Sequence, residues 1–204
     1  MLEYIDVTHT YLYDGVIIPS VSQILQEKIF FDKYKEVPEN ILKAKANYGT
    51  IVHSSIEMYE NNINTMQNEE AFDTTIIALN LNYTQVISLK EYLELKNKNN
   101  IEVLEQEKLV CYKGLYAGRF DMVAKINDEL CLVDIKTTAQ LDLEYLSWQL
   151  SMYELADGRK FDRLFCIWLP KKDIGKIVEV KRKDVKEIEK LFETEKGENY
   201  ENEI

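Results

Sequence analysis

Two aspartates and a lysine interrupt otherwise apolar stretches of the segment "GRFDMVAKINDELCLVDIKTT", residues 118–138. Asp121 and Asp134 are 13 residues apart, and Lys136 follows Asp134 by two positions. A charged group in a buried strand costs free energy unless it is paired or binds a metal. These three groups therefore either neutralise one another in a structural cluster or build a site.

The spacing of the three groups suits a metal site on a hairpin. Residues two apart on a strand share a face, so Asp134 and Lys136 point the same way. A turn at "ND", residues 127–128, would bring Asp121 beside Asp134. Two carboxylates so close repel each other unless a cation lies between them, and Mg²⁺ prefers such oxygen ligands. Lys136 could then orient or deprotonate a water and stabilise a developing anion, which predicts metal-assisted phosphodiester hydrolysis.

Two pairs at helical spacing could complete such a site. Gln149 and Tyr153 are i, i+4 on a predicted helix and can hydrogen-bond a phosphate or a water, although a half-buried polar edge has the same pattern. His53 and Glu57 are also i, i+4 and could ligate or brace a metal. A single histidine on a helix is more often a surface or satisfied core residue, so this pair is the weaker indication.

The elements that would position these residues follow from periodicity and turn signals. Asp14-Gly15 predicts a turn between two short β segments, and Ser20 predicts a helix N-cap. Asp142 and Gly158 predict the two ends of a later helix. The predicted helices cover residues 20–25, 30–63 with breaks at Pro38 and Gly49, 84–100, 143–156 and 183–193, and the predicted strands cover residues 101–112, 116–126, 129–137, 163–170 and 176–182. This order predicts a mixed α/β layered domain.

Composition restricts the class of protein. A chain of 204 residues is long enough for one domain, or one domain with an insertion, and 46% hydrophobic residues suit a globular core. No apolar run reaches the ~20 residues of a membrane span, and the start lacks the pattern of a signal peptide, so we expect a cytoplasmic protein. The cysteines are dispersed without a CxxC pair, which argues against a zinc ribbon or an iron–sulfur cluster; they are Cys111, Cys131 and Cys166.

The net charge of −11 argues against a non-specific nucleic-acid binder. The acid is unevenly spread, because the last twelve residues carry much of it. The segment "LPKKDIGKIVEVKRKDVK", residues 169–186, is locally basic. The charge of the whole chain therefore does not describe the charge of a cleft.

Four short motifs occur in a fixed order: "GTIVH" at 49–53, "GRFD" at 118–121, "DIK" at 134–136 and "QLSMY" at 149–153. Together they resemble the PD-(D/E)xK nuclease superfamily, in particular its RecB-like branch. Each motif alone is weak, but the set in order is specific. The opening "YDGVIIPSVSQIL" resembles the N-terminus of small phage-encoded members.

The resemblance implies a restriction-endonuclease-like core, in which helices flank a mixed central sheet, with an N-terminal helical region. The implied organisation is one nuclease domain, residues 1–204. It comprises an N-terminal hairpin and helices at 1–48, a core at 49–196 with a helical insertion at about 64–100, and an acidic tail at 197–204. The iron–sulfur subtype of the family needs four cysteines, and this chain has three.

The resemblance also implies roles for individual residues. The metal ligands would be His53, Asp121, Asp134 and the carbonyl of Ile135. Lys136 would act on the attacking water, and Gln149 and Tyr153 would position the phosphate and the strand. Glu107 resembles an acidic residue often found in the family, although Glu105 shares its predicted strand face, and Arg119 is a candidate phosphate contact. Independently of the resemblance, Glu57 is an accessory candidate because it lies one turn after His53, and Lys43 and Lys45 are candidate DNA contacts because they lie just before the His53 helix and could line the entrance of the site.

These roles predict a Mg²⁺- or Mn²⁺-dependent deoxyribonuclease. We expect an exonuclease that processes DNA ends in phage recombination or replication, in the host cytoplasm. DNA would be its partner, together with a single-strand annealing or single-strand binding protein, and oligomeric state is left open. One alternative is a structure- or site-selective endonuclease. An alternative of another class is a non-catalytic DNA-binding protein or an acidic DNA mimic.

Overall fold

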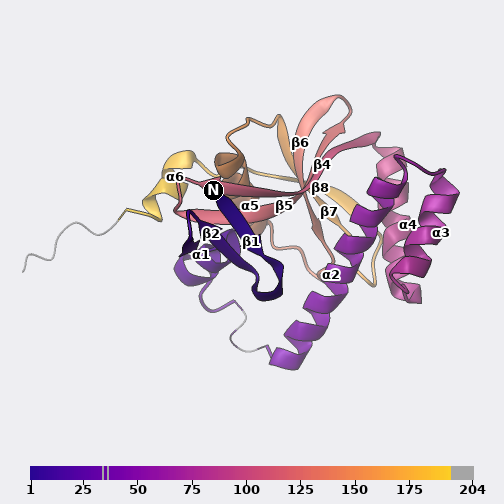
Figure 1. The fold of residues 1–204 in the computed structure, drawn as a ribbon, viewed down its shortest axis with the longest axis horizontal. Coiled ribbons are helices and arrows are strands. Elements are labelled where there is room, and N and C mark those ends of the chain that lie inside the picture. The colour runs from indigo at the N-terminus through magenta and orange to yellow at the C-terminus, as the bar shows by residue number, and fades with distance from the viewer. Residues whose placement is uncertain (34, 36, 194–204) are drawn as a thin grey trace, which may run out of the picture.

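The structure, a computed structural model, describes residues 1–33, 35 and 37–193. The predicted acidic tail at 197–204 lies outside the described residues. The chain forms a five-stranded mixed sheet with helices on both faces, beside a smaller three-stranded sheet near the N-terminus (Figure 1). This confirms the predicted mixed α/β fold class.

The N-terminal sheet is antiparallel and contains β1 (Leu2–Ile5), β2 (Thr10–Tyr13) and β3 (Val16–Ile18), with a 3-10 turn η1 (Asp6–Thr8) between the first two. Asp14 and Gly15 both have positive φ, as a two-residue hairpin turn requires, so the predicted turn is confirmed. Helix α1 (Val21–Lys28) begins at Ser20. The Ser20 side chain accepts a hydrogen bond from the Gln23 backbone, and the Gln23 side chain accepts one from the Ser20 backbone.

Helix α2 (Glu39–Asn62) is a continuous helix of 24 residues, so the predicted break at Gly49 is wrong. A glycine inside a helix costs only about 1 kcal/mol, and the buried face of α2 offsets that cost. That face includes Tyr48, Val52, Ile56 and Tyr59. The glycine instead serves a close approach, because a Cβ at position 49 would lie 3.3 Å from Thr137 Oγ1.

Two further helices, α3 (Asn68–Ala78) and α4 (Tyr83–Lys98), occupy the range predicted as a helical insertion. They lie beside α2 on one side of the large sheet (Figure 1). The predicted boundary between residues 48 and 49 falls inside α2. No helix among residues 1–33, 35 and 37–193 has the length and apolar character to cross a membrane.

The large sheet has the strand order β4 (Ile101–Tyr112), β5 (Tyr116–Ile126), β6 (Glu129–Lys136), β7 (Arg163–Trp168) and β8 (Lys176–Val180). Strands β6 and β7 are parallel, and the other neighbours are antiparallel. Helix α5 (Leu143–Asp157) connects the parallel pair, and α6 (Val185–Lys190) follows β8. Asn127 and Asp128 both have positive φ, so the predicted β5–β6 hairpin is confirmed.

The sheet separates two hydrophobic cores. Helices α2, α3 and α4 pack against one face, which includes Met122, Val133 and Ile167. Helices α1, α5 and α6 pack against the other face, which includes Leu132 and Cys166. Alternation along β6 places Asp134 and Lys136 on the same face as Leu132 and therefore toward α5.

Candidate metal centre

The two aspartates lie where β5 and β6 separate. The pairing of these strands ends at Met122 and Val133, immediately before Asp121 and Asp134 would meet. Beyond that point β5 stays with β4, and β6 stays with β7. Asp121 Oδ2 accepts a hydrogen bond from the Ile135 backbone N–H at 2.6 Å, so a side chain replaces the missing backbone partner. We call the point where β5 and β6 separate, at Asp121 and Asp134, the fork.

Three side chains bring metal-binding atoms together at the fork. His53, Glu107 and Asp121 each offer one ligand atom, and these atoms all lie within 4.8 Å of one another. His53 reaches the fork from α2, and its Nδ1 is 3.3 Å from Asp121 Oδ1. Imidazole and carboxylate donors suit a divalent ion such as Mn²⁺, and carboxylates suit Mg²⁺. The donor set therefore fits the implied metal.

Glu107 joins this group through an irregularity in β4. The flanking pairs, Lys108 with Phe120 and Gln106 with Met122, place Glu107 opposite Asp121. The backbone of Glu107 has φ 48°, in the left-handed region, which costs a residue with a side chain roughly 1–2 kcal/mol. Such a residue interrupts the alternation of a strand.

The same irregularity separates Glu107 from Glu105. Strand alternation predicts that the two glutamates share a face, but Glu105 hydrogen-bonds Arg159 at 3.0 Å, away from the fork. Glu107 Oε2 instead lies 2.8 Å from Arg119 Nε. Glu107 is only an accessory candidate from the sequence, because no sequence signal marks a glutamate with left-handed backbone conformation inside a strand.

Asp134 and Lys136 form a buried ion pair beside the three-atom group. Asp134 is 3% exposed, and its Oδ2 lies 2.6 Å from Lys136 Nζ. Asp134 is outside the group of three, so its role as a ligand stays a prediction. The N–H and C=O of a strand residue point to the same side, so the Ile135 carbonyl faces the fork with its N–H. Its role as a ligand also stays a prediction.

The electrostatics of the fork show an excess of buried negative charge. Burial and the neighbouring Asp121 raise the pKa of Glu107 to about 7. Burial also raises the pKa of Asp134 to about 6, although Lys136 opposes this shift. Burial acts against ionisation of Asp121 too, but His53 and Lys136 outweigh it and lower its pKa. A bound cation would remove the need for protons on these carboxylates.

The two basic groups at the fork, His53 and Lys136, both have raised pKa values. Burial acts against protonation of His53, but the charge of Asp121 outweighs it and raises the pKa of the imidazole. Burial likewise opposes the charge on Lys136, and Asp134 with Asp121 overcomes it, so the pKa of the ammonium is raised. Lys136 is therefore held as a cation.

Gln149 and Tyr153 lie buried on α5 and face this region. Gln149 Nε2 donates to Tyr153 Oη at 3.3 Å, and Gln149 Oε1 has no hydrogen-bond partner among the residues that the structure describes. Burial raises the pKa of Tyr153 well above its usual range, so the hydroxyl stays neutral and can donate. The aromatic ring passes directly over Gly118. A buried acceptor without a donor is consistent with a missing water or ligand.

The other predicted residues do not join the group. Glu57 is one turn after His53 on α2 and lies outside the three-atom group. Arg119 is engaged with Glu107, and its guanidinium lies 5.0 Å from the centroid of the Tyr4 ring. Its contact with DNA stays a prediction.

The two candidate lysines of α2 are distant from the fork. Lys43 pairs with Glu39 at 2.7 Å, and both Lys43 and Lys45 are exposed. At 1.5 Å per residue they lie about 15 Å and 12 Å along the helix from His53. Their role at the entrance stays a prediction.

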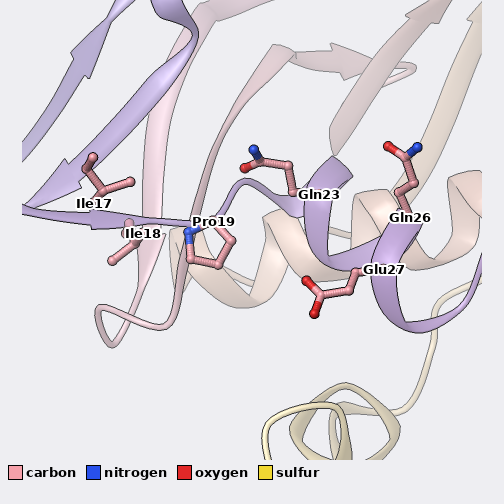
Figure 2. Close-up of a pocket in the computed structure, with 6 residues that line it drawn as sticks. All are labelled: Ile17, Ile18, Pro19, Gln23, Gln26 and Glu27. Atoms are coloured by element: carbon pink, nitrogen blue, oxygen red, sulfur yellow. The ribbon is translucent and has the colours of Figure 1, made fainter. Parts of the chain in front are cut away.

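A hollow between β3 and α1 is separate from this chemistry. Its lining consists of Ile17, Ile18, Pro19, Gln23, Gln26 and Glu27 (Figure 2). Figure 2 shows the three polar side chains arising from α1 and the apolar ones from β3 and the residue after it. None of these residues belongs to the fork, so the candidate site is the charged cluster and not this hollow.

No family model and no curated protein sequence matches the chain. Among solved structures, the crystal structure of SSO0001 is similar, with 17% sequence identity and a TM-score of 0.36. The alignment covers 69% of this chain and 71% of that chain. A TM-score of this size does not establish a common fold.

Proposed function

We propose that this protein is a divalent-metal-dependent deoxyribonuclease. The observation that carries the proposal is the convergence of ligand atoms from His53, Glu107 and Asp121 within 4.8 Å, beside the buried Asp134–Lys136 pair. A purely structural cluster would not require a glutamate in a left-handed backbone conformation. Without a cation, burial leaves Glu107 and Asp134 with raised pKa values, and a bound cation would lower them.

His53, Glu107 and Asp121 would hold the metal, with Asp134 and the Ile135 carbonyl as the further predicted ligands. A bound Mg²⁺ or Mn²⁺ supplies Lewis-acid stabilisation of charge on a phosphodiester. The residues of the chain supply the rest, since a nuclease must orient water, bind the phosphate and balance the developing charge.

Lys136 is the cation that the chain itself contributes. Its raised pKa favours orienting a water and stabilising a phosphoryl oxygen over taking up a proton. The neutral Tyr153 hydroxyl can donate to a phosphate oxygen, and the unpaired Gln149 Oε1 can accept from a water. Together these groups could position a phosphodiester without adding negative charge.

The motif resemblance supports the finer parts of the proposal. These are DNA as substrate, removal of nucleotides from ends, and a role in phage recombination or replication in the host cytoplasm beside a single-strand annealing or binding protein. Fold alone does not separate exonuclease from endonuclease. A covalently closed circle distinguishes them, because it offers no end.

The test is cleavage of labelled linear and circular DNA with Mg²⁺, Mn²⁺ or a chelator. We expect metal-dependent loss of the linear substrate, inhibition by chelator, and at least a hundredfold slower cleavage by Asp121→Asn. Glu102→Gln is the matched control, because Glu102 is an exposed carboxylate on β4 away from the fork. Cleavage of circles would indicate the endonuclease, and binding without cleavage under every metal would indicate the non-catalytic class.

A further inference from the structure

Three side chains form a row across one end of the large sheet. Lys136 of β6 pairs in register with Trp168 of β7, and Trp168 pairs with Lys176 of β8. Residues paired on adjacent strands point to the same face, here the face covered by α5. Strands are about 4.8 Å apart, so the row extends about 10 Å from the fork to the edge of the sheet.

Trp168 is held in a fixed position within this row. Its indole N–H donates to the Thr138 carbonyl at 2.7 Å, just beyond Lys136. Lys176 Nζ lies 5.6 Å from the ring centroid and 3.4 Å from Asp173 Oδ2, and the Lys176 side chain is 53% exposed. Because an exposed ion pair of this kind contributes little free energy, a phosphate can replace the Asp173 carboxylate. An aromatic ring beside an exposed cation is the arrangement that binds a base by stacking and its phosphate by charge.

The loop between β7 and β8 adds positive charge at the same end of the sheet. It contains Lys171 and Lys172, with Asp173 as its one acidic residue. Lys171 Nζ lies 3.4 Å from the centroid of the Tyr48 ring, next to Gly49 on α2. The loop therefore lies against the helix that carries His53.

Two cations later in the basic segment are already neutralised by the protein. Arg182 pairs with Glu154 at 2.7 Å, and Lys183 pairs with Glu144. These residues follow β8, at the opposite end of that strand from Lys176. In a chain with a net charge of −11, the loop after β7 is thus a local positive region next to the fork.

We propose that a single strand of DNA runs from the metal centre along this row, with one base stacked on Trp168 and a phosphate at Lys176. The inference rests on the proposed nuclease function and adds a path and a strand preference to it. At the spacing of about 3.4 Å between stacked nucleotides of a duplex strand, a row of about 10 Å holds at most about three nucleotides. The strand must be single, because the faces of paired bases are hidden inside a duplex.

The chain has two tryptophans, which makes the path measurable by fluorescence. Trp148→Phe leaves Trp168 as the sole tryptophan. We expect its emission to be quenched when a 15-nucleotide oligothymidylate is added in Ca²⁺, which occupies oxygen-ligand sites. We expect a duplex of the same length to give little quenching.

Affinity measurements test the middle and the outer end of the row. Trp168→Ala should weaken oligothymidylate binding about tenfold or more, and Trp168→Phe should retain part of the affinity. Lys176→Ala should weaken binding and reduce the slope of log affinity against log salt by about 0.7, the value for one phosphate on a single strand. Lys183→Ala is the matched control and should leave both quantities unchanged. Thermal melts confirm that each variant is folded.

The outcomes separate this inference from the function on which it rests. Metal-dependent cleavage by wild type, together with an unquenched Trp168 and unchanged affinity of Trp168→Ala and Lys176→Ala, would overturn the path and leave the nuclease standing. Equal quenching by duplex would overturn the strand preference. Wild type that neither binds nor cuts DNA would overturn both.

Discussion

The Tyr153 ring lies so close to Gly118 that a Cβ atom at position 118 would be 2.4 Å from Tyr153 Cε1. The glycine that opens the "GRFD" motif is therefore required by packing and not by backbone conformation. It allows a side chain of α5 to lie on the strand that carries Asp121. One contact thus joins the second and fourth motifs physically.

Gly118→Ala should destabilise the protein by about 1–3 kcal/mol, because the ring must leave its buried position. Denaturant unfolding measures the change. The matched test is the same substitution in a Tyr153→Leu background, where the ring is gone and the cost should largely disappear. An equal cost in both backgrounds would show that the contact is not the cause.

Lys136→Met should destabilise the protein, by on the order of 3 kcal/mol at pH 8, because it leaves Asp134 buried without its partner. The loss should be smaller at pH 5. Asp134 already has a raised pKa of about 6, and losing the lysine raises it further above the unfolded value of about 3.9. The folded state then binds the proton more tightly, so stability falls as pH rises through this window.

Unfolding curves at pH 5, 6.5 and 8 check this prediction. Lys136→Arg keeps the charge and should lose less stability at every pH. A loss for Lys136→Met that does not change between pH 5 and pH 8 would contradict the assigned pairing.

Metal affinity should increase between pH 6 and pH 8. Burial raises the pKa of Glu107 to about 7, so below that pH a proton competes with the ion, and the protonated His53 competes in the same direction. Calorimetric titration with Mn²⁺ in two buffers of different ionisation enthalpy measures the protons released. Glu107→Gln should bind at least tenfold more weakly and release fewer protons, while Glu102→Gln should match wild type in both respects.

Asp157 should support stability at neutral pH and lose that effect in acid. Its side chain is 1% exposed and lies 2.9 Å from Lys108 Nζ. Burial opposes its ionisation, but hydrogen bonds from Arg159 and Lys108 outweigh burial and lower the pKa. A lowered pKa stabilises the fold above about pH 4, and the contribution disappears as pH falls through the folded value.

Asp157→Asn should therefore cost about 2 kcal/mol at pH 7 and almost nothing near pH 2. Thermal melts across this range measure the difference from wild type. Glu179→Gln is the control, since Glu179 is 54% exposed in its pair with Arg163, and its substitution should change stability little at any pH. A constant difference for Asp157→Asn at all pH values would refute the assignment.

Local sequence signals predicted the elements that depend on local chemistry. Asp14-Gly15 and Asn127-Asp128 gave the two hairpin turns, because these residues tolerate positive φ. Ser20 gave the start of α1 through its exchange of hydrogen bonds with Gln23. In each case the decisive contacts lie within four residues, so the sequence window contains them.

Features that depend on distant contacts could not be predicted. Gly49 looks like a helix break until Thr137 is found beside it. Glu105 and Glu107 look equivalent until Arg159 and Arg119 draw them to different sides. The position of the fork could not be predicted either, because it depends on the residue at which β5 stops pairing with β6.

The uninterrupted course of α2 also limits how far His53 can be displaced. At Gly49 the helix closely approaches Thr137, the residue after β6, and His53 follows four residues later, about 6 Å along the axis. Asn62, at the far end of α2, is about 20 Å from the same contact. If the helix tilts about Gly49, His53 moves only about a third as far as Asn62 does. A given tilt of α2 therefore displaces the imidazole less than it displaces the end of the helix beside the helical insertion.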